Sequence, residues 1–157
     1  MKVLIIGAGV IGTVYGAHLG AAGHTVHVLS HPPRTDDIAA GGLAARDVLD
    51  TDIDSDYGAA FGQFREEFPD IVTRRTTVVI LGDGRGNGHD PNVPAFEEIA
   101  RRGKQVIWLT PERRNMWRLG HCDLPGYAEL CDRVDVVRDL DGLDRATDDI
   151  LAGLAGR

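Results

Sequence analysis

The sequence has few lysines and cysteines, and it has no long run of basic or apolar residues. Lys2 and Lys104 are its only lysines, and arginine supplies the other basic charge. The net charge of −7 makes nucleic acid or an anionic membrane an unfavourable partner. The longest apolar run, residues 3–11, is broken by glycine and is far too short to cross a bilayer. No secretory cleavage site follows that run, so we expect a cytoplasmic protein.

Two cysteines, Cys122 and Cys131, are too few for a disulfide framework. His121 precedes Cys122, which would suit a pair of zinc ligands, but no CxxC motif completes a site. We therefore interpret both thiols as structural. The 43% hydrophobic and 26% charged residues are typical of a globular protein. A length of 157 residues fits a single domain.

Short β-branched runs alternate with amphipathic segments along the whole chain. This alternation predicts a parallel sheet with right-handed crossovers. We predict an α/β fold, a Rossmann-like doubly wound three-layer α/β/α sandwich with a five-stranded parallel sheet of order 2-1-3-4-5. The expected strands are residues 2–6, 25–29, 76–81, 105–109 and 134–137. The expected helices are residues 10–19, 54–68, 90–102, 125–131 and 141–154.

Polar residues before these helices predict where each helix begins. Asp54 or Ser55 can cap the second helix, and Asp141 can cap the last one. Aromatic residues within the second helix share one face and predict core packing; they are Tyr57, Phe61, Phe64 and Phe68. Residues 30–53 are rich in turn formers and predict a long loop.

A glycine motif, Gly7-Ala-Gly9-Val10-Ile11-Gly12, follows the first expected strand and opens the first helix. Gly7 permits a tight turn, Gly9 lets the backbone approach a pyrophosphate, and Gly12 lets the helix pack closely on the strand. Backbone N–H groups at the start of the helix, including those of Val10 and Ile11, favour a bound phosphate. The motif predicts a dinucleotide site, with a purely structural turn as the alternative.

The end of the second strand indicates which dinucleotide to expect. An NAD site usually has an acidic residue there to bind the ribose hydroxyls. Here the strand ends at Leu29-Ser30-His31, and the first carboxylate is Asp36. Ser30, His31 and Arg34 are residue types that accept a 2′-phosphate, so we expect NADP(H). The alternative is that His31 and Arg34 are solvated loop residues.

Residues 1–34 resemble the N-terminus of the ketopantoate reductase family, and Ile38-Ala-Ala-Gly-Gly-Leu43 resembles that family's next segment. The resemblance covers about residues 1–48 and implies an NADP-binding unit. The family's 2-keto acid reduction uses a lysine and an acidic residue from a helical C-terminal domain, which this sequence does not match. Catalytic residues are therefore unknown. As an enzyme, the chain would be an NADP-dependent reductase with a partner that supplies the substrate domain.

From about residue 51 the sequence resembles the C-terminal half of CoxE-type von Willebrand A domains. The resemblance reaches to about Leu151 and rests on Asp56-Tyr-Gly58, residues 75–84, residues 106–112, Trp117 and Cys131-Asp132. It implies a protein-interaction domain with a metal-ion-dependent adhesion site at the carboxyl ends of the strands. Asp83 matches the aspartate after that family's fourth strand, and Ser55 lies near its threonine position.

The main element of that metal site, an Asp-x-Ser-x-Ser run, is missing because the glycine motif occupies its place. A divalent cation prefers several oxygen ligands, and only Asp83 and Ser55 remain as weak candidates. We therefore interpret the chain as a hybrid within one domain. A dinucleotide-binding βαβ unit at 1–48 would be joined to a von Willebrand A-like half at 49–157, by natural fusion or by engineering.

In the predicted strand order, the glycine motif faces Gly82 and Asp83. A carboxylate ~6 Å from a pyrophosphate charge repels it by roughly 3 kcal/mol at an effective dielectric near 20. Arg85, Arg113 or Arg114 could offset this repulsion, as could a Mg²⁺ ion that bridges Asp83 and phosphate. We expect weak NADP(H) binding, micromolar or poorer.

Other polar loop residues, His89, His121 and Asp123, form no recognisable catalytic set in the sequence. Three functions stay open. The favoured one is an NADP(H)-binding module without a reaction of its own. The others are an oxidoreductase acting with a partner, and a von Willebrand A-like interaction module. The remaining alternative is a hybrid scaffold that folds and binds nothing.

Overall fold

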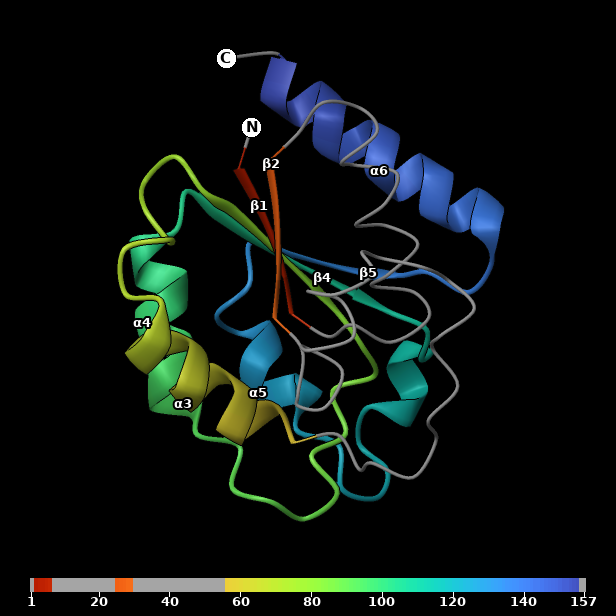
Figure 1. The fold of residues 1–157 in the computed structure, drawn as a ribbon. Coiled ribbons are helices and arrows are strands. Elements are labelled where there is room, and N and C mark those ends of the chain that lie inside the picture. The colour runs from red at the N-terminus through yellow and green to blue at the C-terminus, as the bar shows by residue number, and fades with distance from the viewer. Residues whose placement is uncertain (1, 7–24, 30–55, 156–157) are drawn as a thin grey trace, which may run out of the picture.

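The computed structural model describes residues 2–6, 25–29 and 56–155, and the side chains of residues 56–139, 141–150 and 152. These residues form a parallel sheet of strand order β2-β1-β3-β4-β5 (Figure 1). Its strands are β1 (Lys2–Ile6), β2 (Thr25–Leu29), β3 (Thr77–Leu81), β4 (Gln105–Thr110) and β5 (Arg133–Val136). The α/β class and the parallel pairing predicted from the sequence are confirmed.

The middle strand, β3, pairs with β1 on one side and with β4 on the other. All five of its residues are buried, which agrees with its β-branched sequence and its position between two layers of helices. The last three strands each differ from the prediction by one residue at one or both ends: β3 begins at Thr77, and β5 ends at Val136. Thr110 extends β4, and β5 begins at Arg133.

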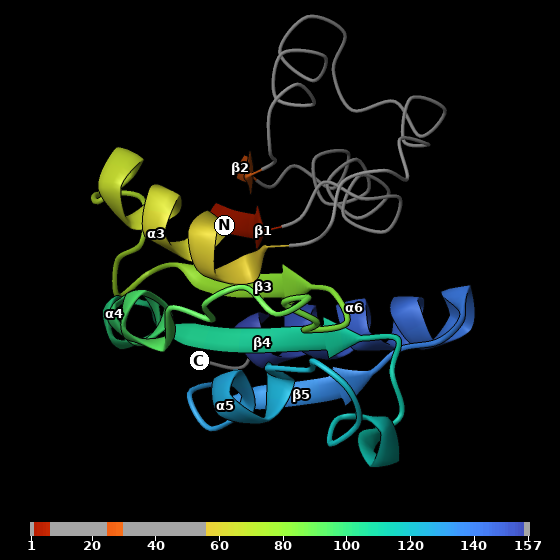
Figure 2. The same cartoon turned by 90° about the horizontal axis from the view of Figure 1, so that it is seen from below.

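Helices cover both faces of this sheet (Figures 1 and 2). One face carries α3 (Tyr57–Glu67), α4 (Val93–Arg102) and the short α5 (Leu124–Ala128). The other face carries α6 (Leu140–Ala155). A single 3₁₀ turn, η2 (Arg114–Met116), lies between β4 and α5. No helix in the described part of the chain is long and apolar enough to span a membrane.

An aromatic cluster fills the space between the sheet and α3, α4 and α5. Trp108 of β4 is fully buried and stacks on Tyr127 at 5.3 Å between ring centroids. Phe61 and Phe96 meet across the α3–α4 interface at 4.7 Å. The predicted aromatic face is confirmed for all its members except Phe68, which is 39% exposed. Phe68 is the residue that ends α3, and its backbone N–H donates to the Phe64 carbonyl at 3.0 Å.

A smaller apolar cluster joins α6 to the opposite face of the sheet. Ala146 is buried there against Val79 and Ile107, and Leu143 and Ile150 are partly buried beside it. The side chains of Leu151 and Leu154, further along α6, lie outside the described residues.

The cap predicted for α6 is wrong by two positions. The Asp139 carboxylate, not that of Asp141, accepts a hydrogen bond from the Gly142 N–H at 2.7 Å. The helix begins at Leu140, so Asp141 already lies in its first turn. An acidic residue in the first turn interacts favourably with the helix dipole. Its side chain cannot accept hydrogen bonds from the free N–H groups as the side chain of an N-cap residue does.

The cap of α3 also differs from the prediction. Asp56 fills this position, and its carboxylate accepts a hydrogen bond from the Ala59 N–H at 2.8 Å. The predicted alternatives, Asp54 and Ser55, lie outside the described residues, as do the helix expected at 10–19 and the loop expected at 30–53.

The helix expected at residues 90–102 is α4, which begins three residues later, at Val93, and the helix expected at 125–131 is α5, which spans Leu124–Ala128. Asn92 precedes α4 in the left-handed conformation and Gly103 ends it.

Candidate functional site

Two loops meet at the carboxyl edge of the sheet. The first (residues 82–92) follows β3, and the second (residues 111–123) follows β4; we call them the carboxyl-edge loops. Figure 2 shows the chain leaving the arrow ends of these two neighbouring strands. The Asp123 N–H donates to the Gly84 carbonyl at 2.8 Å, and Arg85 forms an antiparallel bridge with Cys122. Backbone contacts therefore hold the two loops together.

Asp83, the expected metal and phosphate neighbour, is held by its own loop and by α3. Its Oδ1 accepts a hydrogen bond from the Arg85 N–H at 3.0 Å and one from the Tyr57 hydroxyl at 3.3 Å. The Tyr57 oxygen in turn accepts from the Gly84 N–H at 3.4 Å. Burial raises the pKa of Tyr57, and the charge of Asp83 raises it further. The hydroxyl therefore stays protonated and acts as a donor to Asp83.

Gly82 lets Tyr57 reach this position. A Cβ atom at Gly82 would lie 1.9 Å from the Tyr57 hydroxyl oxygen, closer than any real contact. The Gly82 carbonyl also accepts the Trp108 indole N–H at 2.8 Å. Because Gly82 has no side chain, the Tyr57 ring can pack against Trp108 of β4.

Arg85 and Glu112 form a bidentate ion pair between the two loops. Nε and Nη2 of Arg85 each lie 2.8 Å from an oxygen of Glu112, and Nη1 donates to the Leu119 carbonyl at 3.1 Å. The hydrogen bond with Glu112 raises the pKa of Arg85. The guanidinium is thus engaged by Glu112, so its expected role of offsetting the Asp83 charge is disfavoured.

The second carboxyl-edge loop has its own anchor, Trp117. Its ring is buried, and its indole N–H donates to the Glu112 carbonyl at 3.1 Å. The Arg114 guanidinium lies 5.1 Å from the centre of this ring and also donates to the Val134 carbonyl at 3.3 Å. Arg114 is therefore directed toward Trp117 and β5, although the sequence suggested it could offset Asp83. Arg113 is exposed beside it.

A histidine–aspartate contact lies where the first loop approaches α3. Nδ1 of His89 is 3.7 Å from the Asp56 carboxylate, which caps α3 through its other oxygen. His121 is exposed, and Asp123 lies so close to Gly86 that a Cβ there would meet its carboxylate at 2.2 Å. The structure pairs His89 with Asp56 and brings none of these residues into a nucleophile–base arrangement.

The residues at this edge do not fit a divalent cation in the described part of the chain. No group of three histidine, cysteine, aspartate or glutamate side chains converges among the described residues. One oxygen of Asp83 already accepts two hydrogen bonds, and Ser55 lies outside the described residues. Both Cys122 and Cys131 are free thiols.

Most of the residues expected to bind the dinucleotide lie outside the described part of the chain. They are Gly7, Gly9, Val10, Ile11, Gly12, Ser30, His31 and Arg34. The described strands nevertheless show where this segment leaves the sheet. β1 ends at Ile6, directly before the glycine motif, and lies between β2 and β3.

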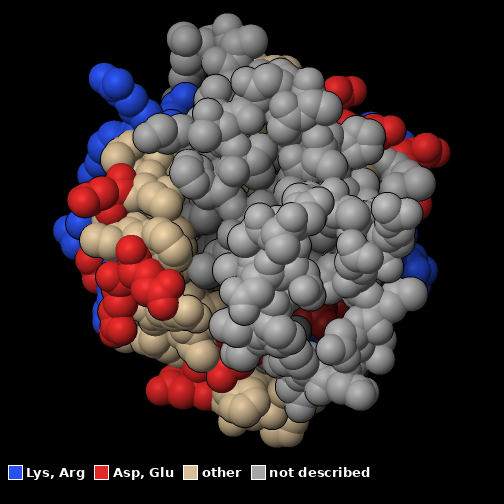
Figure 3. Space-filling view, viewed as in Figure 1, with Lys and Arg blue, Asp and Glu red and all other residues tan. Residues whose placement is uncertain are grey.

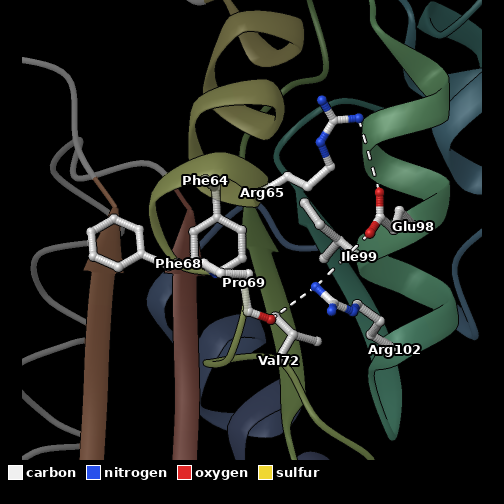
Figure 4. Close-up of a pocket in the computed structure, with 8 residues that line it drawn as sticks. All are labelled: Phe64, Arg65, Phe68, Pro69, Val72, Glu98, Ile99 and Arg102. Carbon is white, nitrogen blue, oxygen red and sulfur yellow. Dashed lines mark hydrogen bonds and ion pairs between the residues drawn. The ribbon is translucent and has the colours of Figure 1, made fainter.

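A small cavity lies at the opposite, amino edge of the sheet, between the end of α3 and α4 (Figure 4). Its volume of about 10 Å³ suits roughly one water molecule. Arg65 and Arg102 flank Glu98 at its rim, each 3.9 Å from the carboxylate. The cavity is too small for a metabolite and lies away from the carboxyl-edge loops.

The sheet, its two helical layers and the polar loops after β3 and β4 define a Rossmann-like α/β domain of the von Willebrand A class. The chain belongs to the family described as VWA domain containing CoxE-like protein, whose model matches residues 27–145. No curated protein and no solved structure matches the chain. The match begins within β2, earlier than the resemblance noted from residue 51, and the comparisons give no support for a ketopantoate reductase segment.

Sequence reasoning missed Tyr57, Glu112 and Trp117 as site residues. Glu112 could have been found, because Arg85 and Glu112 each follow one of two neighbouring parallel strands, and their side chains meet at one edge. The role of Tyr57 depends on its close approach to Gly82, which no sequence pattern indicates.

Proposed function

We propose that the chain is a von Willebrand A-like protein-interaction domain whose contact surface is formed by the carboxyl-edge loops. The observation that carries this proposal is the bidentate Arg85–Glu112 pair, which links the two loops while most of the second loop remains exposed. Loops held in one conformation lose less entropy when a partner binds. The family match to residues 27–145 supports the same class of function.

The small volume of the cavity in the described part of the chain also favours a macromolecular partner over a small molecule. Small-molecule sites are concave and enclose most of their ligand, whereas the cavity described above holds roughly one water. Figure 3 shows acidic and basic side chains interspersed along the margin occupied by α3 and α4. Such a mixed surface is typical of a soluble domain outside its contact area.

Selection from a phage-displayed library of random dodecapeptides tests the proposal on the purified protein. Peptides that bind should perturb the amide NMR signals of residues 82–92 and 111–123 and leave those around Lys104, at the amino edge, unchanged. Binding should not change with EDTA or added Mg²⁺, because the described residues supply one candidate carboxylate, Asp83. Failure to select any binder, or perturbations confined to the amino edge, would contradict the proposal.

The second candidate is a weak NADP(H) site at the switch point of the sheet. It is supported by the strand order, because the glycine motif begins where β1 ends between β2 and β3, and ligands bind at such points in open α/β sheets. The described side of this crevice fits a pyrophosphate poorly. Asp83 is negatively charged there, and Arg85 is engaged by Glu112. We therefore rank this function second.

Titration of the protein with NADPH and NADH separates this candidate from the first. NADPH should bind more tightly than NADH, with a micromolar or poorer dissociation constant, and Gly9→Asp should abolish binding without changing the selected peptides' affinity. Equal affinity for the two nucleotides would contradict the NADP assignment. Peptide binding that requires nucleotide would contradict the independence of the two functions.

A further inference from the structure

The second carboxyl-edge loop is basic in a chain that is acidic as a whole. Residues 113–121 contain three arginines and one histidine and no acidic residue, whereas the whole chain has a net charge of −7. Arg113 and Arg118 are exposed, and neither has an ion-pair partner among the described side chains. The acidic residue just before them, Glu112, is already neutralised by Arg85. Residues 113–121 are therefore a basic segment within this edge.

Two large apolar side chains are exposed within the same loop. Met116 is 39% exposed and Leu119 is 53% exposed. Trp117, between them in sequence, is buried and fixed by the Glu112 carbonyl, so the loop backbone is anchored beneath the exposed side chains. Arg85 also holds the Leu119 carbonyl at 3.1 Å. Apolar side chains exposed on an anchored backbone can contact a partner without the cost of ordering the loop.

We propose that residues 113–121 bind an acidic segment of a partner protein that also carries apolar side chains. The charge of Arg113 and Arg118 selects carboxylates, and Met116 and Leu119 require an apolar counterpart. A nucleic acid would satisfy the arginines but would leave the two apolar side chains against a charged backbone. A second copy of this chain would also supply acidic groups, on α6, but two copies repel each other through their net charge of −7.

This inference rests on the proposed function and names the partner's chemistry for the same surface. The two can fail separately. If selected peptides perturb the carboxyl-edge loops but are neither acidic nor sensitive to the arginines, the interaction surface stands and the present inference falls. If no peptide binds at that edge, both fall.

The direct test uses a labelled dodecapeptide with four glutamates and two leucines spaced by glycine, followed by fluorescence anisotropy. Matched probes replace the leucines with serine or the glutamates with glutamine, and a single-stranded dodecanucleotide serves as a polyanion. We expect the glutamate–leucine peptide to bind and each replacement to weaken binding about tenfold, as expected for two ion pairs or two apolar contacts. Binding should also weaken as salt is raised.

Two double variants within residues 113–121, with a third at the amino edge as the control, locate the binding surface. Arg113→Ser/Arg118→Ser should weaken peptide binding about tenfold, while Arg101→Ser/Lys104→Ser, which removes the same charge at the amino edge, should leave it within about twofold. Met116→Ser/Leu119→Ser should lose the preference for leucine over serine. Arg113, Met116, Arg118 and Leu119 are all exposed. Circular dichroism should therefore show an unchanged fold in the variants of the second loop.

Three results would overturn the inference. The first is an equal loss of binding in the two charge variants. The second is binding of the oligonucleotide or the serine peptide as tight as that of the leucine peptide. The third is a dimer, seen by analytical ultracentrifugation, that the Arg113→Ser/Arg118→Ser change dissociates.

Discussion

Arg85 and Glu112 make two parallel contacts of 2.8 Å, and this pair connects the loop after β3 to the loop after β4. Each residue is about a quarter exposed, with side-chain exposures of 26% and 21%. Bidentate guanidinium–carboxylate pairs are more directional than a single contact. Since Arg85 also reaches the Leu119 carbonyl, it fixes both ends of the segment that carries Trp117. The geometry of the second loop therefore depends on one side chain of the first.

Replacing Arg85 with lysine should loosen the second loop. Lysine keeps the charge but has one ammonium group, so it cannot contact both oxygens of Glu112 and the Leu119 carbonyl together. We expect a loss of about 1 kcal/mol in the free energy of unfolding. Hydrogen exchange should also become faster at residues 113–121. Urea unfolding and exchange mass spectrometry provide the two measurements.

The control for that change is Arg65→Lys, because Arg65 contacts Glu98 at 3.9 Å with a single nitrogen. This longer, more exposed pair should contribute less than about 0.5 kcal/mol. Unaltered hydrogen exchange in the Arg85→Lys variant would show that the backbone bonds of the loops are sufficient without the ion pair.

Gly82→Ala should disturb the packing of Tyr57. The added Cβ would lie 1.9 Å from the hydroxyl oxygen and 2.9 Å from Cζ of that ring, so the ring or the strand end must move. We expect a loss of about 2 kcal/mol, typical of overpacking a buried site. In a double-mutant cycle, Tyr57→Phe should recover part of this loss because it removes the nearest atom. Additive losses in the double variant would contradict the predicted contact.

Gly126→Ala is the matched control for the glycine substitution. A Cβ at Gly126 meets nothing within 4 Å, and Gly126 lies inside α5. Alanine there should stabilise the protein by about 0.5–1 kcal/mol through its higher helix propensity. If Gly126→Ala lowered the free energy of unfolding as much as Gly82→Ala, the space around each glycine would not explain the effect of the substitution.

The sequence predicted much of the described fold because its signals are local. The β-branched run at β3, the prolines and Gly103 around α4, and the aromatic face of α3 each act through neighbouring residues. The site was harder to predict because its contacts are distant in sequence. Tyr57 and Asp83 are 26 residues apart, and Arg85 and Glu112 are 27 apart. Such contacts depend on strand order and on side-chain space, which a single sequence does not display.

The glycine motif at residues 7–12 raises a different difficulty for predicting a function from sequence. The glycine motif is a strong local pattern, and it led the sequence analysis to a dinucleotide function. The family match to residues 27–145 supports the interaction domain instead. A local motif indicates what a backbone segment can do, whereas the charge of Asp83 and the engagement of Arg85 decide what the opposite side of the crevice allows.

The N-terminal cap of α6 can be tested directly, because the structure places it at Asp139 and the sequence pattern predicted Asp141. Asp139→Ala should cost about 1 kcal/mol, because it removes the acceptor of the Gly142 N–H at the start of α6. Asp141→Ala should cost less than about 0.5 kcal/mol, since Asp141 contributes only to the helix dipole from the first turn. Urea unfolding of the two variants decides between them. A larger loss for Asp141→Ala would favour the cap predicted from the sequence.

Alkaline pH should destabilise the protein through Cys131. Burial raises the pKa of this thiol from 9.0 to about 12, and the neighbouring charge of Asp132 adds to the effect. The folded state therefore keeps a proton that the unfolded chain loses. The contribution to stability is complete below pH 9 and is lost as the pH rises toward 12, with a slope of up to about 1.4 kcal/mol per pH unit.

Cys131→Ser isolates this contribution. A serine hydroxyl can replace the thiol as a donor to the Tyr127 carbonyl, which now accepts from Sγ at 3.3 Å, but it does not ionise in this pH range. The variant should lose stability at pH 7 by its packing difference alone and should then show a smaller decline than the wild type between pH 9 and 10.5. Unfolding by urea under reducing conditions measures both declines. Parallel curves for the two proteins would mean that the thiol ionises equally in the folded and unfolded chain, and that Tyr57 and Tyr127, whose pKa values are also raised by burial, cause the alkaline loss.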